Sequence, residues 1–425
     1  MLRPKEFLEQ QFHLIDEEIK EALRHEYGPA ESGDFFVECQ ERLATLRASD
    51  PKTPAELSEI LLKASQLGAL IERIQHSHLG EFPWAFAEEL RALAIALCSS
   101  LEGISPLFYF SSQGRLDDYA VHDEQELFDF FRRPIFNVVF PRSLKHQVLV
   151  HPVLGHEIAH ALLSLPKPAL LKKMVLGKLF KTGPLSTAAE FKKWLQREKS
   201  DWASLESRKL EEIRKEWREE LLCDLLGLLI MGPGFTPALL SMLGATDASG
   251  MLVSPEHPPA ICRFFVQRDA IESLRWLGGR YGARLQRVER RLWRGMAAIE
   301  RNRSVRPLVS AALVAASIRY LQKELQGSHA LFERKSLAPI STLVAQLRNV
   351  VPPVGKQDLG KVLPTSPVDF RAVIYAGWLA VEQRRGHEAR PDVDNLNRLC
   401  ELAMVQQRAI ASVANWNKRQ RGGAV

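Results

Sequence analysis

The chain has 425 residues, of which 46% are hydrophobic and 25% charged, and its formal net charge at pH 7 is +6. This length allows two or three domains and a large core, and the ordinary composition argues against a disordered or fibrous protein. Five scattered cysteines without a Cys-x-x-Cys pair exclude a disulfide framework and a cysteine zinc site as readings of the sequence.

The first 105 residues are predicted to form a helical region. Apolar residues recur at helical spacing from Leu8 to Ala22 and from Phe35 to Leu46. A third helix is expected to begin at Thr53-Pro54-Ala55-Glu56, a capping box with proline at the first helical position. A fourth helix is expected from Ala85 to Leu101, and no motif in this region points to a function.

Two short segments after residue 105 have the composition of β-strands. Leu107–Phe110 and Ile135–Phe140 are rich in aromatic and β-branched residues and lie close to glycine or proline. After residue 265 the pattern is helical again, with helices expected from Leu308 to Leu325, Ser341 to Val350 and Phe370 to Arg385. The sequence therefore predicts a mainly α fold with a small β-sheet, in three regions: 1–105, 106–265 and 266–425.

The start of the chain and its longest apolar run bear on the cellular compartment. The first residues lack an apolar signal core, and the apolar run from Leu221 to Met231 is shorter than the roughly 20 residues that span a bilayer. We expect a soluble, cytoplasmic protein without a membrane span.

Residues 153–163 are expected to form a helix that carries the pattern His-Glu-x-x-His. Because His156 and His160 are four residues apart, they project from one face and can reach one metal ion, with Glu157 beside them. A pattern with three fixed positions also arises by chance in chains of this length. Its interpretation therefore depends on a third ligand elsewhere in the sequence.

A second helix supplies candidate carboxylates. Glu220 and Asp224 lie one turn apart, where a charged helix becomes apolar on all sides, and buried carboxylates need a cation or hydrogen-bond donors. Glu220 can complete a His, His, Glu zinc set, and Asp224 can accept the outer N–H of a ligating histidine. Glu219 is the competing third ligand, and a buried salt bridge to arginine or lysine is the other explanation for the two carboxylates.

The segment Ser254–Arg263 contains a histidine followed by two prolines, which marks a loop entering a helix. His257 there either caps the helix or faces the metal together with Arg263. In the second case the two side chains donate to the oxyanion of a tetrahedral intermediate or fix the glutamate ligand.

The three motifs in this order, His-Glu-x-x-His, Glu-x-x-x-Asp and His-Pro-x-x-x-x-Arg, resemble the gluzincin metallopeptidases. The resemblance is to the group of membrane-embedded CAAX-prenyl proteases and small soluble minigluzincins, and it covers about residues 106–265. It implies a zincin-like α+β core that contains the sheet. The lack of predicted membrane helices here argues against a prenylated or membrane substrate.

The resemblance also implies a role for each matched residue. In that family the two histidines and the later glutamate bind zinc, the motif glutamate is the general base, and the aspartate orients a histidine. Carried over to this chain, these are His156, His160, Glu220, Glu157 and Asp224. The downstream histidine and arginine of the family match His257 and Arg263.

We therefore expect a zinc metalloendopeptidase of the gluzincin type, in which Glu157 activates the attacking water and a protein or peptide is the substrate. The segment Ile135–Phe140 could be an edge strand that binds this substrate, or an ordinary core strand. The competing hypothesis is a regulatory or nucleic-acid-binding protein with a structural or vestigial zinc site, based on the arginines between positions 284 and 303. A solvated helix face explains these arginines more simply. A zinc hydrolase that cleaves a non-peptide amide is a third possibility.

Overall fold

The computed structural model describes most of the chain, in the following segments: residues 4–24, 32–75, 83–103, 106–113, 119–123, 131, 133–198, 200–246, 254–276, 308–326, 328–355, 367–382 and 392–422. The described residues are mainly helical and include one three-stranded sheet, which confirms the predicted mainly α fold with a small sheet. The arginines between positions 284 and 303 lie outside these segments.

The chain divides into two compact units. Unit 1 comprises Met1–Ser99 and Gly103–Lys145, and unit 2 comprises Ser100–Glu102 and His146–Val425. This division places a boundary after Lys145, and the boundaries predicted after residues 105 and 265 stay predictions. Each residue that the sequence suggested as a metal ligand or catalytic group belongs to unit 2.

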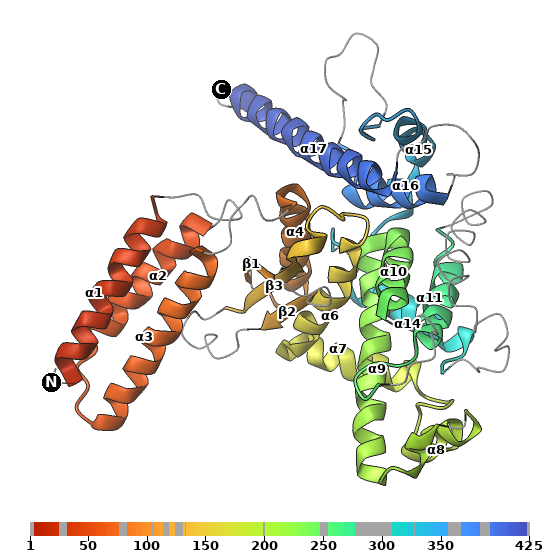
Figure 1. Cartoon of the computed structure of the whole chain (residues 1–425), viewed down its shortest axis with the longest axis horizontal. Helices are drawn as coiled ribbons and strands as arrows, with labels where there is room; N and C mark the ends of the chain where they lie inside the picture. The colour runs from red at the N-terminus through yellow and green to blue at the C-terminus, as the bar shows by residue number, and fades with distance from the viewer. Residues whose placement is uncertain are drawn as a thin grey trace. The chain divides into compact units, whose positions relative to one another are not determined.

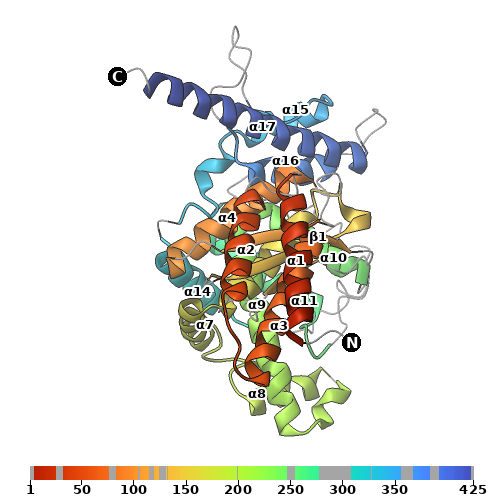
Figure 2. The same cartoon turned by 90° about the vertical axis from the view of Figure 1, so that its left-hand side faces the viewer.

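The helices of unit 1 begin and end close to their predicted positions: α1 is Pro4–Ala22, α2 is Ser32–Arg47, α3 is Pro54–Gln75 and α4 is Trp84–Glu102. The predicted capping box is present at the start of α3, where Thr53 Oγ1 accepts from Glu56 N–H at 3.2 Å and Glu56 Oε2 accepts from Thr53 N–H at 3.3 Å. Helices α1, α2 and α3 run side by side around a shared hydrophobic core (Figure 1, Figure 2).

The sheet of unit 1 has the strand order β1-β3-β2, where β1 is Leu107–Gln113, β2 is Ala120–Asp123 and β3 is Ile135–Pro141. The strand β3 pairs in parallel with β1 and antiparallel with β2. All seven residues of β3 are buried, as expected for a central strand. The hypothesis that Ile135–Phe140 is a substrate-binding edge strand is therefore wrong, because both of its edges are already paired.

The secondary structure described for unit 2 is helical. Its helices are α6 (Leu154–Ser164), α7 (Pro166–Leu179), α8 (Ala188–Arg197), α9 (Ser207–Met231), α10 (Phe235–Thr246), α11 (Ala260–Leu274), α14 (Ala311–Glu324), α15 (Ile340–Arg348), α16 (Phe370–Glu382) and α17 (Val393–Gly422). Short 3₁₀ turns connect several of them, at His151–Val153, Asp201–Ser204, Gly232–Gly234 and Arg334–Leu337. The helices α14, α15 and α16 confirm the helices predicted in the C-terminal region.

The long helix α9 forms the centre of unit 2 and packs against α6, α7, α8, α10 and α11 (Figure 1). Its second half is buried on every side, as its uniformly apolar sequence predicts. By length and composition alone, the stretch Ser207–Gly244 could cross a membrane, and 89% of its apolar window is buried inside the protein. A buried core helix meets the same criterion, so this stretch gives only weak support for a membrane span.

Candidate metal centre

Two glycines allow α6 and α9 to approach each other at backbone distance. A Cβ atom on Gly155 would lie 2.5 Å from Met231 Cγ and 3.4 Å from the Cα of Gly227. A Cβ atom on Gly227 would lie 2.7 Å from ring carbons of Phe235 and 3.0 Å from the backbone nitrogen of His156. Neither position has room for a side chain, so glycine at both positions is what permits this close contact. The contact brings the His-Glu-x-x-His segment of α6 next to the carboxylates of α9.

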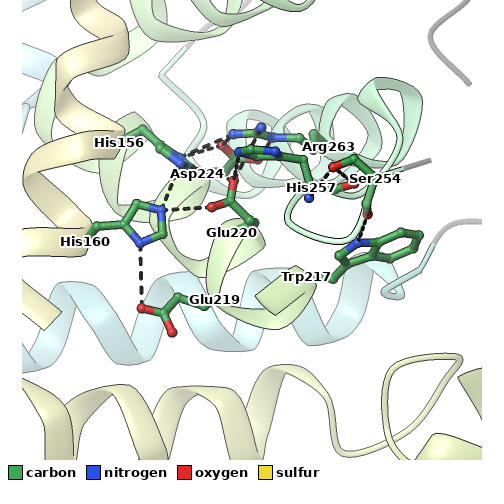
Figure 3. Close-up of polar contacts among 9 residues, drawn as sticks. All are labelled: His156, His160, Trp217, Glu219, Glu220, Asp224, Ser254, His257 and Arg263. Carbon is green, nitrogen blue, oxygen red and sulfur yellow. Dashed lines mark hydrogen bonds and ion pairs between the residues drawn. The ribbon is translucent and has the colours of Figure 1, made fainter. Parts of the chain in front are cut away.

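Two imidazoles and one carboxylate converge between these helices (Figure 3). The Nε2 atoms of His156 and His160 lie 3.1 Å apart. Glu220 places Oε1 at 2.9 Å from His160 Nε2 and Oε2 at 3.3 Å from His156 Nε2. Each of the three residues offers a ligand atom, and these atoms all lie within 4.8 Å of one another. The structure thus brings together the three residues that the sequence predicted as metal ligands.

Asp224 holds the outer nitrogen of His156. Its Oδ1 lies 3.0 Å from His156 Nδ1, which favours the tautomer that donates from Nδ1 and leaves the Nε2 lone pair free toward the cluster. Asp224 also accepts two hydrogen bonds from Arg263, at 2.7 and 2.8 Å. The aspartate therefore combines the histidine contact and the buried salt bridge that the sequence left as alternatives.

The Nδ1 atom of His160, which points away from Glu220, also lies near a carboxylate, that of Glu219. Glu219 Oε1 lies 3.6 Å from His160 Nδ1, on the side away from Glu220, and the other carboxylate oxygen of Glu219 forms an ion pair with Lys172 of α7. Glu219 thus lies behind His160 and not among the converging ligand atoms (Figure 3). This placement favours Glu220 over Glu219 as the third ligand.

The histidines and carboxylates of the cluster shift one another's pKa values toward the charged forms. Burial alone would raise the pKa of Glu220, but His156, His160 and Arg263 hold it well below its usual value, so this carboxyl group is ionised. Burial alone would lower the pKa of His156, but Glu220 and Asp224 outweigh this effect and raise it. The site therefore favours positive charge next to the Glu220 carboxylate.

The donor set fits a zinc ion. Zinc binds imidazole nitrogen and carboxylate oxygen at about 2.0–2.1 Å, so two ligand atoms of a tetrahedral site lie about 3.3 Å apart. The ring nitrogens and carboxylate oxygens of this cluster are separated by 2.9 to 3.3 Å. Glu220 Oε2 is buried and forms no hydrogen bond among the described residues, although His156 Nε2 and Arg263 Nη1 lie 3.3 and 3.4 Å from it.

The cluster is closed on one side and open on the other. The side chains of His156 and Glu220 are 4% and 9% exposed, whereas that of His160 is 30% exposed. Glu157 is half-buried in the first turn of α6 and forms no hydrogen bond or ion pair within the described segments. A catalytic zinc site needs such an open position and a base that is not otherwise engaged.

His257 and Arg263 occupy different positions. His257 is 55% exposed and its Nε2 lies 3.7 Å from Glu220 Oε2, at the open side of the cluster. Arg263 is 3% exposed and its Nη1 lies 3.4 Å from the same oxygen. Of the two roles considered from the sequence, Arg263 has the geometry to fix the carboxylates. His257 has the exposure that contact with a substrate requires.

A tethered turn positions His257. Ser254 Oγ accepts from the backbone N–H of His257 at 2.8 Å, and the carbonyl oxygen of Ser254 accepts from Trp217 Nε1 at 2.9 Å. Because Trp217 belongs to α9, the turn is attached to the helix that carries Glu220 (Figure 3).

Sequence reasoning missed two neighbours of the cluster. Lys172 lies in a basic part of the sequence between Lys167 and Lys181, and its ion pair with Glu219 depends on the packing of α7 against α9. Cys223 is one of the five scattered cysteines; it is buried, contacts His160 and contributes to the raised pKa of that imidazole.

Comparison of the chain with protein-family models, with curated proteins and with solved structures finds no match. The assignment of a function therefore depends on the chemistry of the cluster.

Proposed function

We propose that this protein is a zinc-dependent hydrolase that cleaves peptide bonds. The observation that carries the proposal is the convergence of His156, His160 and Glu220, whose ligand atoms all lie within 4.8 Å of one another, with Glu157 directly after His156 on the same helix. Two imidazoles and one carboxylate form a donor set that zinc peptidases use, and a structural zinc site would have no need of the adjacent free carboxylate. The resemblance of the three sequence motifs to gluzincins agrees with this chemistry.

Residues of the chain itself carry the proton transfers and the orientation of the substrate. Glu157 accepts the proton of the attacking water and later delivers it to the leaving amine. His257, exposed at the open side, donates to the oxygen of the scissile carbonyl as negative charge develops there. Asp224 and Arg263 hold the ring of His156 in place. When bound, zinc supplies Lewis acidity at the reacting carbonyl and water.

Two other functions are compatible with parts of the sequence. The nucleic-acid hypothesis is based on arginines between positions 284 and 303, and the segments that the structure describes add nothing in its favour. Hydrolysis of a non-peptide amide would use the same residues in the same roles, so the chemistry of the cluster does not separate it from peptide hydrolysis. We favour peptides because the matched motifs are those of peptidases.

The test is Glu157→Gln in the zinc-loaded protein, assayed with a library of quenched fluorescent peptides beside Glu272→Gln. Glu272 is exposed on α11 and provides a matched carboxylate away from the cluster. Because a positioned general base contributes about 10²–10⁴-fold, Glu157→Gln should lose at least about 100-fold in kcat/KM and still bind zinc by elemental analysis. Equal activity of the Glu157→Gln variant and the wild type would contradict the proposal.

A further inference from the structure

A cavity of about 450 Å³ is lined by residues of α9, of the turn before α11 and of the segment around Asp201–Ser204. Much of its lining is apolar and comes from Trp202, Leu205, Ile213 and Pro255. Ile213 is buried, and Trp202 and Leu205 are half-buried, so these side chains present fixed apolar surface. A cavity of this size and lining accommodates the stem of a large side chain.

The cavity is connected to the cluster through two elements. On α9, Ile213 and Glu216 line the cavity, and Glu220 follows one turn after Glu216 on the same face of the helix. On the turn before α11, Pro255 and Glu256 line the cavity and are followed directly by His257, which reaches Glu220. Residues of the cavity lining and of the metal centre therefore lie on the same two elements.

The polar groups around the cavity are mainly acidic. Glu212, Glu216 and Glu256 line it together with a single lysine, Lys209. Glu212 is paired with Arg208, whereas neither Glu216 nor Glu256 has a hydrogen bond or ion pair among the described residues. Of the acids that line the cavity, Glu216 precedes Glu220 by four residues and Glu256 directly precedes His257. The near end of the cavity therefore carries uncompensated negative charge.

We propose that this cavity binds a lysine or arginine side chain of the peptide substrate. An aliphatic stem packs against Trp202 and Ile213 while the cationic head lies between the carboxylates of Glu216 and Glu256. A neutral aliphatic side chain would leave both acids unpaired, and an acidic side chain would be repelled by them. This inference rests on the proposed peptidase function and adds to it a preference for basic residues.

The position of the cavity sets where the basic residue lies in the substrate. Along α9, Glu216 and Ile213 precede Glu220 by four and seven residues, which is about 6 and 10 Å at 1.5 Å per residue. An extended peptide advances about 3.3 Å per residue, so this span corresponds to two or three residues. The basic side chain is expected within three residues of the cleaved bond.

The first experiment measures binding without catalysis. Ligand-observed NMR titrations compare Nα-acetyl-lysine N-methylamide with Nα-acetyl-norleucine N-methylamide, which has an uncharged aliphatic side chain. Wild-type protein should bind the lysine amide about fivefold to tenfold more tightly, the effect of two partly exposed ion pairs. The double variant Glu216→Gln/Glu256→Gln should lose this difference. The control Glu272→Gln/Glu333→Gln, which removes two exposed carboxylates outside the cavity, should keep it.

The second experiment uses a quenched peptide library in which each position around the cleaved bond is varied in turn. The zinc-loaded wild type should prefer lysine or arginine at one position, and Glu216→Gln/Glu256→Gln should lose this preference in the ratio of kcat/KM values. Peptides cleaved without a basic preference, or equal binding of the two amides, would overturn the cavity assignment and leave the peptidase proposal in place. Selective binding of the lysine amide by a protein that cleaves no peptide would overturn the peptidase proposal instead.

Discussion

Arg263 donates two hydrogen bonds to Asp224, from Nε to Oδ2 at 2.8 Å and from Nη2 to Oδ1 at 2.7 Å, and both side chains are buried. Asp224 Oδ1 also lies 3.0 Å from His156 Nδ1. One fully buried carboxylate therefore joins three helices, α6, α9 and α11. Because a bidentate pair fixes orientation as well as charge, the ring of His156 has little freedom even when no metal is bound.

Removing Arg263 should destabilise the whole of unit 2. Arg263→Ala leaves the Asp224 carboxylate buried without its main cation, and breaking such a pair costs about 3–5 kcal/mol. Arg263→Lys should recover only part of this loss, since an ammonium group cannot donate in bidentate geometry. The free energy of unfolding from urea titrations measures both effects.

The matched control for Arg263→Ala is Arg208→Ala. Arg208 donates to Glu212 on the surface of α9, where the two side chains are 90% and 60% exposed. An exposed pair of this kind contributes about 0–1 kcal/mol, so the control should unfold at nearly the wild-type urea concentration. Similar destabilisation by the two variants would contradict the buried-pair account.

The two adjacent glutamates of α9 should differ in their effect on metal content. Glu220→Ala removes a ligand atom and should abolish zinc retention, as measured by elemental analysis after dialysis. Glu219→Ala removes only the outer partner of His160, so zinc should still bind, with an affinity lower by about 10–100-fold. Loss of zinc in Glu219→Ala together with full retention in Glu220→Ala would reverse the ligand assignment.

A methyl group at the crossing of α6 and α9 should disturb both folding and metal binding. Gly227→Ala places a carbon 2.7 Å from the Phe235 ring and 3.0 Å from the backbone of His156, and such overpacking costs about 1–3 kcal/mol. The helices must separate to relieve it, so zinc affinity should fall as well. Thermal unfolding and zinc titration of the purified variant test these two effects.

Gly177→Ala provides the contrast for this substitution. Gly177 is also helical, in α7, but among the described residues no atom outside the adjoining backbone of its own helix lies within 4 Å of the position that its Cβ would occupy. Here alanine should stabilise the protein by roughly 0.5–1 kcal/mol through its better helix propensity. Opposite signs for the two glycine substitutions are expected; equal destabilisation would count against the close-contact explanation.

The thiols of the five cysteines should resist alkylation at alkaline pH. All five are buried, and burial raises the pKa of Cys39, Cys262 and Cys400 and raises that of Cys223 to about 12. A raised pKa keeps the thiol protonated in the folded protein. The stability that the buried, protonated thiol contributes is fully present below the unfolded-state pKa of about 8.5, and it is lost as the pH rises through the higher pKa of the folded state. Labelling with iodoacetamide at pH 8 should therefore be slow in the native protein and fast in urea. Rapid labelling of Cys400 in the native state would contradict this expectation.

The helices and the convergence of His156, His160 and Glu220 could be predicted because their signals are local. The capping box at Thr53 and the spacing of His156 and His160 depend on residues within one helical turn. The preference for Glu220 over Glu219 came from the same kind of evidence, since only Glu220 has a carboxylate four residues later. Each of these inferences required only the geometry of a single helix.

The remaining features depend on contacts between distant segments. The place of β3 at the centre of the sheet was missed because β2 is only four residues long and its pairing with β3 is set by tertiary structure. The partner of Arg263 lies 39 residues away on another helix, and the ion pair of Lys172 with Glu219 joins α7 to α9. No periodicity within one segment carries this information.

The continuity of α9 has a consequence for how this protein can vary. Glu216 at the cavity, Glu220 in the cluster, Asp224 behind it and Gly227 at the crossing lie within twelve consecutive residues of one unbroken helix. Inserting or deleting a single residue among them would rotate one group relative to the others by about 100°. Point substitutions can change each group separately, but the number of residues between them fixes the relative positions of all four.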